Sequence, residues 1–327
     1  GPGWTPNIVP PVQEAQVTVV KPGLETLRKA INNAVSGSTL ILETGEYFSE
    51  KKIKITKDIT IIGDIGGATI LAANKNIEKP IDYLFRVEEN VTFKLSHVFI
   101  DGKNSNLKYA IVSPDKLQGA RYNLFVDTVT FQNFKNKKGG SVFKAYNGTK
   151  ADTLSFVNSR FENNYRGLNL SYDNKNTGMF NANFIVLKNS VFKNIEESAI
   201  NYVRKIPNNM ISGGDLLVEN CVFYNVDNRE KGKIIKADGI HRVKIVNSVF
   251  DNSYKIKTPI VLKGMSQQIS NCLINNSGYM KISQGARKSD LLYKSPKWED
   301  KTLFIPSKKS ALLKEKNKKA TIGLLQK

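Results

Sequence analysis

The stretch Leu187-Lys188-Asn189-Ser190-Val191-Phe192-Lys193-Asn194 decides the fold, because its pattern recurs along the chain. Each copy has an aliphatic residue, an asparagine, a small residue, a phenylalanine and a second asparagine, and the other clear copies span residues 157–163, 218–225 and 246–252. Weaker copies run through Phe99, Phe131 and Ile274, so the aromatic position recurs every 24 to 32 residues. A repeat of this length indicates one small structural unit that is stacked many times.

The repeat predicts strands rather than helices, since its segments are short, β-branched and aromatic, and are bounded by Asn, Gly, Asp and Lys. Short strands at this spacing predict an all-β coil of parallel strands, in which equivalent residues of successive turns lie about 4.8 Å apart. The phenylalanines would then stack in the interior. The second asparagine of each copy would form an amide ladder at a bend that needs left-handed backbone. These asparagines are Asn133, Asn163, Asn194, Asn225, Asn252 and Asn276.

The two ends of the coil are expected to differ from its middle. Residues 24–35 predict a helix, because apolar residues recur at helical spacing and Gly37 follows as a stop. This helix would cap the N-terminal end and protect an open strand edge. We predict an N-terminal extension or inter-domain junction over residues 1–20, the β-helix over residues 21–305, and a basic C-terminal tail over residues 306–327, which is expected to be frayed over residues 308–319.

The charge of the chain indicates an acidic partner. The 327 residues include 49 Lys and Arg against 29 Asp and Glu, a formal net charge of +20, and such a surface attracts polyanions. The composition, 40% hydrophobic and 24% charged, is globular and excludes a wholly disordered or collagen-like chain. Cys221 and Cys272 are too few for a disulfide framework and lie in no metal-binding spacing. No apolar run reaches the length of a membrane helix, so no membrane partner is expected.

Two regions carry a resemblance to a known family. Residues 37–47 with Ile59-Thr60-Ile61-Ile62-Gly63 resemble the opening of right-handed parallel β-helix proteins of the pectate-lyase type. Residues 178–204 and Leu216-Leu217-Val218-Glu219-Asn220 resemble the second β-helix of polysaccharide lyase family six, which includes alginate lyases and relatives of chondroitinase B. The resemblance implies a single-stranded right-handed parallel β-helix, a secreted or periplasmic location, and acidic polysaccharide, either alginate or a glycosaminoglycan, as the partner.

The resemblance also implies a division of labour. In that family the first of two tandem β-helices carries β-elimination, with a Lys base, an Arg and a calcium site, and the second is accessory. The start Gly1-Pro2-Gly3-Trp4 resembles the junction between the two helices, so we expect the chain to be the C-terminal domain, with an N-terminal catalytic β-helix as its partner.

The family's catalytic motif is not found in this sequence. There is no Lys-Ser followed by Arg-His-Gly and no Glu-x-Glu suited to calcium, and Lys205-Ile206-Pro207-Asn208-Asn209 replaces the family's glycine-rich and acidic run. Catalytic residues are therefore left unassigned, as is the question whether the chain is an enzyme. No cofactor or metal site is expected in this chain, and calcium would belong to a separate catalytic domain.

A set of cations follows the aromatic position at a constant offset and predicts a binding stripe. Each of these cations lies 13 residues after an aromatic position of the repeat. If the turns of the coil vary in length only outside this stretch, the cationic side chains would stack along one face, where a polyanion could lie. Chance agreement at this offset is the alternative. The five residues are Lys144, Lys205, Lys236, Lys263 and Arg287.

Arg166, Tyr202 and Arg204 form a second candidate group. They lie on adjacent turns, and a Tyr with two Arg residues could bind a sugar carboxylate. Surface Arg residues and a half-buried Tyr without a binding role are the alternative.

Three functions compete at this point. The first is an accessory β-helix of a polyuronate lyase that grips substrate or packs on a catalytic domain. The second is a β-eliminating lyase with a rearranged Lys/Arg/Tyr site, and the third is a polyanion-binding module without catalysis. The charge would also allow nucleic acid, but no recognised nucleic-acid module is present, which argues against it.

Overall fold

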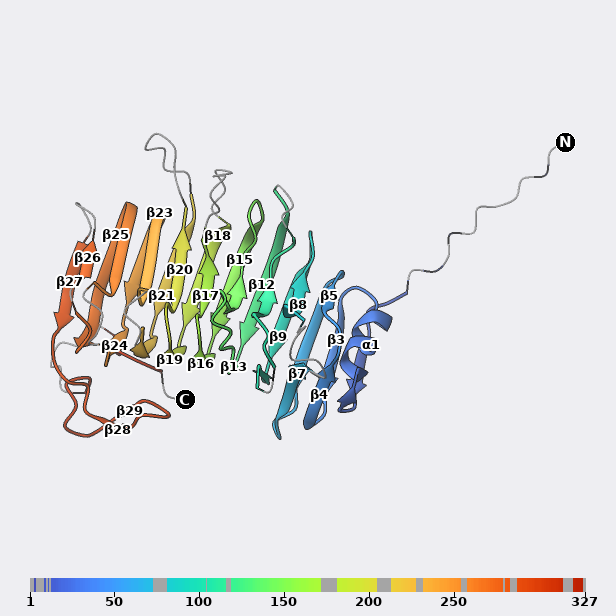
Figure 1. The fold of residues 1–327 in the computed structure, drawn as a ribbon, viewed down its shortest axis with the longest axis horizontal. Coiled ribbons are helices and arrows are strands. Elements are labelled where there is room, and N and C mark those ends of the chain that lie inside the picture. Colours follow the sequence, from blue (N-terminus) through green and yellow to red (C-terminus); the bar gives the residue numbers. More distant parts are fainter. Residues whose placement is uncertain are drawn as a thin grey trace.

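The chain forms a long coil of parallel strands that runs from the helix α1 at one end to the strand β27 at the other (Figure 1). This computed structural model describes residues 13–72, 81–103, 105–115, 119–171, 181–204, 213–227, 232–253, 258–278, 280–282, 287–313 and 320–325, together with residues 3, 9 and 11. Twenty-seven strands belong to one continuous sheet that winds around the core, and the described strand pairs within it are parallel. The predicted all-β, right-handed parallel β-helix is confirmed.

The strands of this continuous sheet line up along three sides of the coil, which we call sheets 1, 2 and 3. Sheet 1 contains β1 (Val17–Val20), β3 (Ser38–Leu42), β6 (Ile59–Gly63), β9 (Thr92–Ser96), β12 (Arg121–Asp127), β15 (Lys150–Val157), β18 (Ala182–Lys188), β21 (Asp215–Glu219) and β27 (Arg287–Leu292). Sheet 2 contains β2 (Gly23–Leu24), β4 (Gly45–Ser49), β7 (Ala68–Ala72), β10 (Val98–Asp101), β13 (Thr130–Gln132), β16 (Arg160–Asn164), β19 (Val191–Ile195), β22 (Val222–Val226) and β24 (Val249–Asp251).

Sheet 3 carries the candidate site. It contains β5 (Ile53–Ile55), β8 (Tyr83–Val87), β11 (Tyr109–Val112), β14 (Ser141–Lys144), β17 (Leu168–Leu170), β20 (Ile200–Val203) and β26 (Met280–Ile282). Two long strands bend around corners: β23 (Ile235–Val246) joins sheets 3 and 1, and β25 (Ile260–Asn275) runs through all three. A separate antiparallel pair is formed by β28 (Trp298–Asp300) and β29 (Ile305–Pro306).

The predicted interior ladders are confirmed. The rings of Phe131, Phe161, Phe192, Phe223 and Phe250 stack with centroids 4.3 to 5.3 Å apart. The six predicted asparagines all adopt positive φ, between 48° and 66°. The Asn225 amide donates to Asn194 at 2.6 Å, and the Asn194 amide donates to Asn163 at 3.3 Å. Stacked rings and stacked amides therefore fix the register of successive turns.

The prediction that Phe99 occupies the aromatic position of the repeat is wrong by one residue. Ile100, rather than Phe99, pairs with Phe131 and is fully buried. Phe99 points out of sheet 2 and is 42% exposed. Successive side chains of a strand point to opposite faces, so a one-residue shift moves the ring from core to surface.

The N-terminal end is capped as predicted. Helix α1 spans Thr26–Asn33, with Leu27 and Ile31 buried against the core. Residues 17–20 pair with β3, so the coil begins before the predicted boundary at residue 21. No helix among the described residues is long and apolar enough to cross a membrane.

The prediction that residues 308–319 form a frayed tail is wrong for residues 308–313, which pack against the coil, whereas residues 314–319 lie outside the described residues. Residues 298–313 and 320–325, which we call the C-terminal strap, fold back under the coil (Figure 1). Phe304, Leu312 and Ile322 are buried against outward-facing apolar residues of sheet 2, which are Val191, Val222, Val249 and Leu273. The Asn220 amide donates to the carbonyls of Thr321 and Gly323 at 2.8 and 2.9 Å. The strap is ordered because it covers apolar surface that the coil leaves outside.

Candidate functional site

The outer face of sheet 3 carries a column of side chains that are polar or charged except for the buried Val112. Adjacent strands bring one residue per turn into register, about 4.8 Å apart. In order the column is Lys54, Arg86, Val112, Lys144, Asn169, Asn201 and Lys236. Neighbouring strand residues such as Phe85, Ile111 and Phe143 are buried in the core. We call this column, with the flanking Tyr109, Tyr146 and Arg166, the Lys144 face.

Lys144 is a partly buried cation beside a second cation. Burial, and then the Arg166 guanidinium, hold the pKa of its amine below the usual range of a lysine. Arg166 donates from Nε and Nη2 to the two carboxylate oxygens of Glu197, at 2.8 and 3.1 Å, and its guanidinium lies 5.1 Å from the ring centre of Tyr165. Glu197 thus fixes Arg166 and partly offsets its charge, while the Lys144 amine is left poised to gain stabilisation from an added anion.

Two tyrosines lie near the arginines of this face, Tyr109 near Arg166 and Tyr146 near Arg86. The rings of Tyr109 and Tyr146 meet edge to face, with centroids 6.5 Å apart. Burial, with a smaller effect of Tyr109, raises the pKa of Tyr146 to about 12. Burial and then Asp82 also raise the pKa of Tyr109. Both phenols therefore stay protonated at neutral pH and can donate hydrogen bonds.

Arg86 extends the cationic character toward the N-terminal end. Its guanidinium lies 4.7 Å from the ring centre of Tyr83 and 3.8 Å from the Asp115 carboxylate. Tyr109, Tyr146 and Arg86 were not predicted from the sequence. They occupy no position of the Phe/Asn repeat, and only the strand register reveals that Arg86 shares the column of Lys144 and that Tyr109 lies on the strand beside it.

The prediction that five cations stack turn by turn is wrong. Lys144 and Lys236 share the column, but Asn169 and Asn201 lie between them. Lys263 pairs with Asp238 instead, and Arg287 lies on sheet 1, where it pairs with Gln268. Lys205 lies outside the described residues.

The reason is that the turns between sheets 2 and 3 differ in length. Asn169 lies eight residues after Phe161 and Lys144 thirteen after Phe131, yet the two residues are register neighbours. An equal offset in sequence is therefore not an equal position in the coil.

The predicted group of Arg166, Tyr202 and Arg204 does not form one surface site. Tyr202 is 0% exposed and its hydroxyl donates to the Ala182 carbonyl inside the coil, so it cannot reach a polymer outside. Arg204 is also buried, and burial lowers its pKa. Only Arg166 of the three belongs to the Lys144 face.

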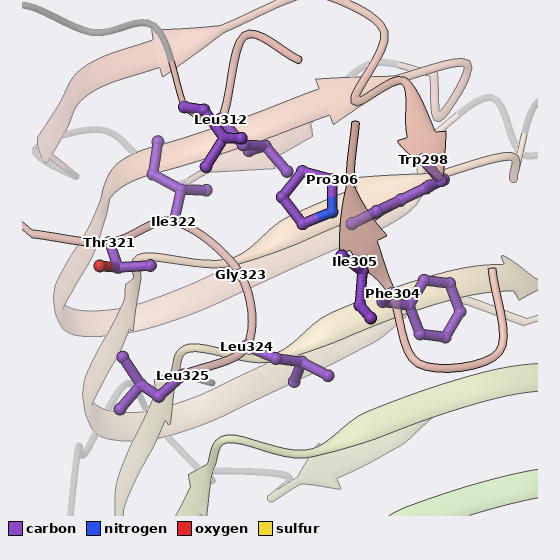
Figure 2. A pocket seen from close by; sticks show the side chains of 11 residues that line it. Trp298, Phe304, Ile305, Pro306, Leu312, Thr321, Ile322, Gly323, Leu324 and Leu325 are labelled. Atoms are coloured by element: carbon purple, nitrogen blue, oxygen red, sulfur yellow. The ribbon is translucent and has the colours of Figure 1, made fainter. Parts of the chain in front are cut away.

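A cavity of about 360 Å³ lies elsewhere, within the C-terminal strap (Figure 2). Apolar side chains point into it, among them Trp298, Leu312 and Ile322. It is separate from the Lys144 face, since the strap packs on sheet 2. Across the described part of the chain, no group of three or more His, Cys, Asp or Glu residues could hold a metal ion.

Comparison with solved structures supports the fold. The chain is similar to the PL6 family alginate lyase AlyGC, with a TM-score of 0.67 and 21% identity, over 88% of this chain and 42% of that chain. A mutant structure of that lyase matches with a TM-score of 0.61 and 20% identity, over 90% of this chain and 40% of that chain. The chain thus spans about two fifths of the solved lyase. No protein-family profile and no curated protein matches the sequence.

Proposed function

We propose that this chain binds an acidic polysaccharide of the uronate type on the Lys144 face, as the accessory β-helix of a polysaccharide lyase. The observation that carries the proposal is Lys144 itself, a partly buried amine beside Arg166 whose charged form an added carboxylate would stabilise. Arg86 and Lys236 in the same column offer further cations along the coil.

Two further observations support this ligand class. The net charge of +20 attracts polyanions, and the backbone fold is that of a solved alginate lyase. A polymer lying along the coil would pass from turn to turn and meet Lys144 and Asn201, which supply charge and an amide hydrogen bond.

An accessory role implies a catalytic partner domain and a cellular location where the polysaccharide is found. We propose that a separate N-terminal β-helix supplies the catalytic residues and the calcium site, and that the protein is secreted or periplasmic, where such polymers are met. The sequence has no Lys-Ser followed by an Arg-His-Gly, which supports an accessory role for this chain.

A second candidate function is β-elimination on the same face. The lowered pKa of Lys144 and the protonated phenol of Tyr146 favour it. Lys144 would take the proton alpha to the sugar carboxylate, Arg166 would stabilise the enolate, and Tyr146 would protonate the leaving oxygen as the carbon–oxygen bond breaks. The product would carry a new carbon–carbon double bond, which absorbs ultraviolet light.

One experiment separates these functions. The purified chain is passed over immobilised alginate, chondroitin sulfate and DNA, and is incubated with each free polysaccharide, with and without calcium, while ultraviolet absorbance is followed. Retention on a polyuronate that Lys144→Ala weakens, with no absorbance change, supports the accessory role. An absorbance rise that Lys144→Ala abolishes supports the lyase. Stronger retention on DNA, or no retention on any polyuronate, contradicts the proposal.

A further inference from the structure

A second column of outward side chains runs along sheet 1, on another side of the coil. Strand pairing places one residue of each successive strand in register. In order these are Lys94, Phe125, Ser155, Val186, Leu217 and Lys244. Phe184 lies beside Val186 on β18. We call these seven residues the Phe125 face.

The two phenylalanines of this face are exposed, whereas Val186 beside them is buried. Phe125 and Phe184 are each 37% exposed, whereas their strand neighbours Leu124 and Ile185 are fully buried. The C-terminal strap, which covers the apolar outer residues of sheet 2, leaves these two rings accessible. Folding of this chain alone does not require exposed aromatic rings on the outer face of a sheet.

Charge is arranged at the two ends of the apolar stretch. Lys94 is the register neighbour of Phe125, and Lys244 is the register neighbour of Leu217. Both lysines are exposed, and neither makes an ion pair with a described residue. Two arginines of sheet 1 are already paired, Arg121 with Asp152 and Arg242 with Asp215. Lys94 and Lys244 are therefore available to an anion.

The dimensions favour a linear ligand. Lys94 and Lys244 are five strand steps apart, or about 24 Å at about 4.8 Å per step. A stable protein interface buries about 1,200 Å² or more around an apolar centre, and four partly covered apolar side chains in a line offer much less. A sugar chain needs less area, because each ring stacks its C–H face on one aromatic ring.

We propose that the Phe125 face is a second polysaccharide-binding surface, on which a linear acidic polysaccharide lies along the coil axis. Phe125 and Phe184 stack on sugar rings, and Lys94 and Lys244 bind carboxylates at the two ends of the bound stretch. The proposal takes its ligand class from the proposed function, but its residues and its sheet are different from those of the Lys144 face.

Calorimetric titration with alginate oligosaccharides tests this. The wild-type chain should bind at two sites, and the double variant Phe125→Ala/Phe184→Ala should keep one, with at least a tenfold loss of affinity at the other. Lys144→Ala, made alone in the wild-type chain, should instead weaken the site that the double variant keeps. The matched control is Phe99→Ala, which removes an equally exposed ring from sheet 2 and should leave both sites unchanged. Thermal melting of each variant checks folding.

The outcomes are distinguishable. Two sites that persist in the double variant, or a single site that only Lys144→Ala weakens, overturn the second surface and leave the proposed function standing. Absence of binding by the wild-type chain overturns both. Equal binding of a neutral glucan at the Phe125 face, or loss of self-association rather than of sugar binding in the double variant, also overturns the proposal.

Discussion

The Lys144 face and the Phe125 face lie on different sides of one coil and use their outward positions in opposite ways. On sheet 3, Lys144 is partly buried beside the Arg166 guanidinium, so the pKa of its amine is already lowered before any ligand binds. On sheet 1, exposed rings lie between solvated lysines. The stacked core dictates the inward residues of both sheets. The outward residues are less constrained, so they are where two kinds of binding surface can develop on one backbone.

The largest loss of stability is expected from substitutions in the hydrophobic core, which supports both faces. Phe143 lies under sheet 3 and Phe156 under sheet 1, and their rings meet with centroids 6.5 Å apart. Each is fully buried, so Phe143→Ala and Phe156→Ala should each lower the free energy of unfolding by about 3–5 kcal/mol. Urea unfolding measures this. A loss below about 1 kcal/mol from either variant would mean that the two faces do not depend on one packed core.

A smaller effect is expected from the ion pair that is specific to the Lys144 face. Glu197→Gln removes the charge that holds Arg166, and should lower the free energy of unfolding by about 1–3 kcal/mol, since Arg166 is left partly buried without its counter-ion. It should also depress the pKa of Lys144 further, because less of the Arg166 charge is offset. The double variant Arg166→Met/Glu197→Met, in which neither charge is left unpaired, should recover part of the loss. No recovery would argue against an electrostatic cause.

The sequence predicted the core better than the surface, for a physical reason. Phe192 and Asn194 repeat because stacking requires the same residue at the same place in each turn, so a period in the sequence becomes a ladder in space. Binding residues obey no such requirement. The offset of 13 residues finds Lys144 and Lys236, which share the outer column of sheet 3, but it also finds Lys263, which lies in another column. Tyr146 and Phe125 left no periodic signal, and only strand register shows their neighbours.

The pH dependence of stability separates the two faces through their lysines. The pKa of Lys144 is lower in the folded chain than in the unfolded chain, so the unfolded chain binds more protons between these two values. The contribution of Lys144 to stability therefore rises with pH through this window, up to about pH 10.4. Relative to Lys144→Met, the wild-type chain should gain stability as pH rises from 7 to 10.

Chemical unfolding of wild-type chain and variant across this range measures the gain. Lys244→Met, which removes an exposed lysine from the Phe125 face, is the matched control. Parallel curves for wild type and Lys144→Met would show that Lys144 is as solvated as a surface lysine.

The smallest change in the free energy of unfolding is expected from breaking the ion pair at the margin of the Phe125 face. Arg121 on β12 pairs with Asp152 on β15, and both side chains are more than one third exposed. Exposed pairs gain little, because water and salt screen them, so Arg121→Ala should change the free energy of unfolding by less than about 1 kcal/mol. The Asp152 carboxylate, once released, would lie near Phe125 and Phe184 and should repel an acidic polymer. Arg121→Ala should therefore weaken oligosaccharide binding at low salt more than it weakens folding. If the variant binds as tightly as wild type at low salt, the polymer does not pass this pair, and the path along sheet 1 must be redrawn.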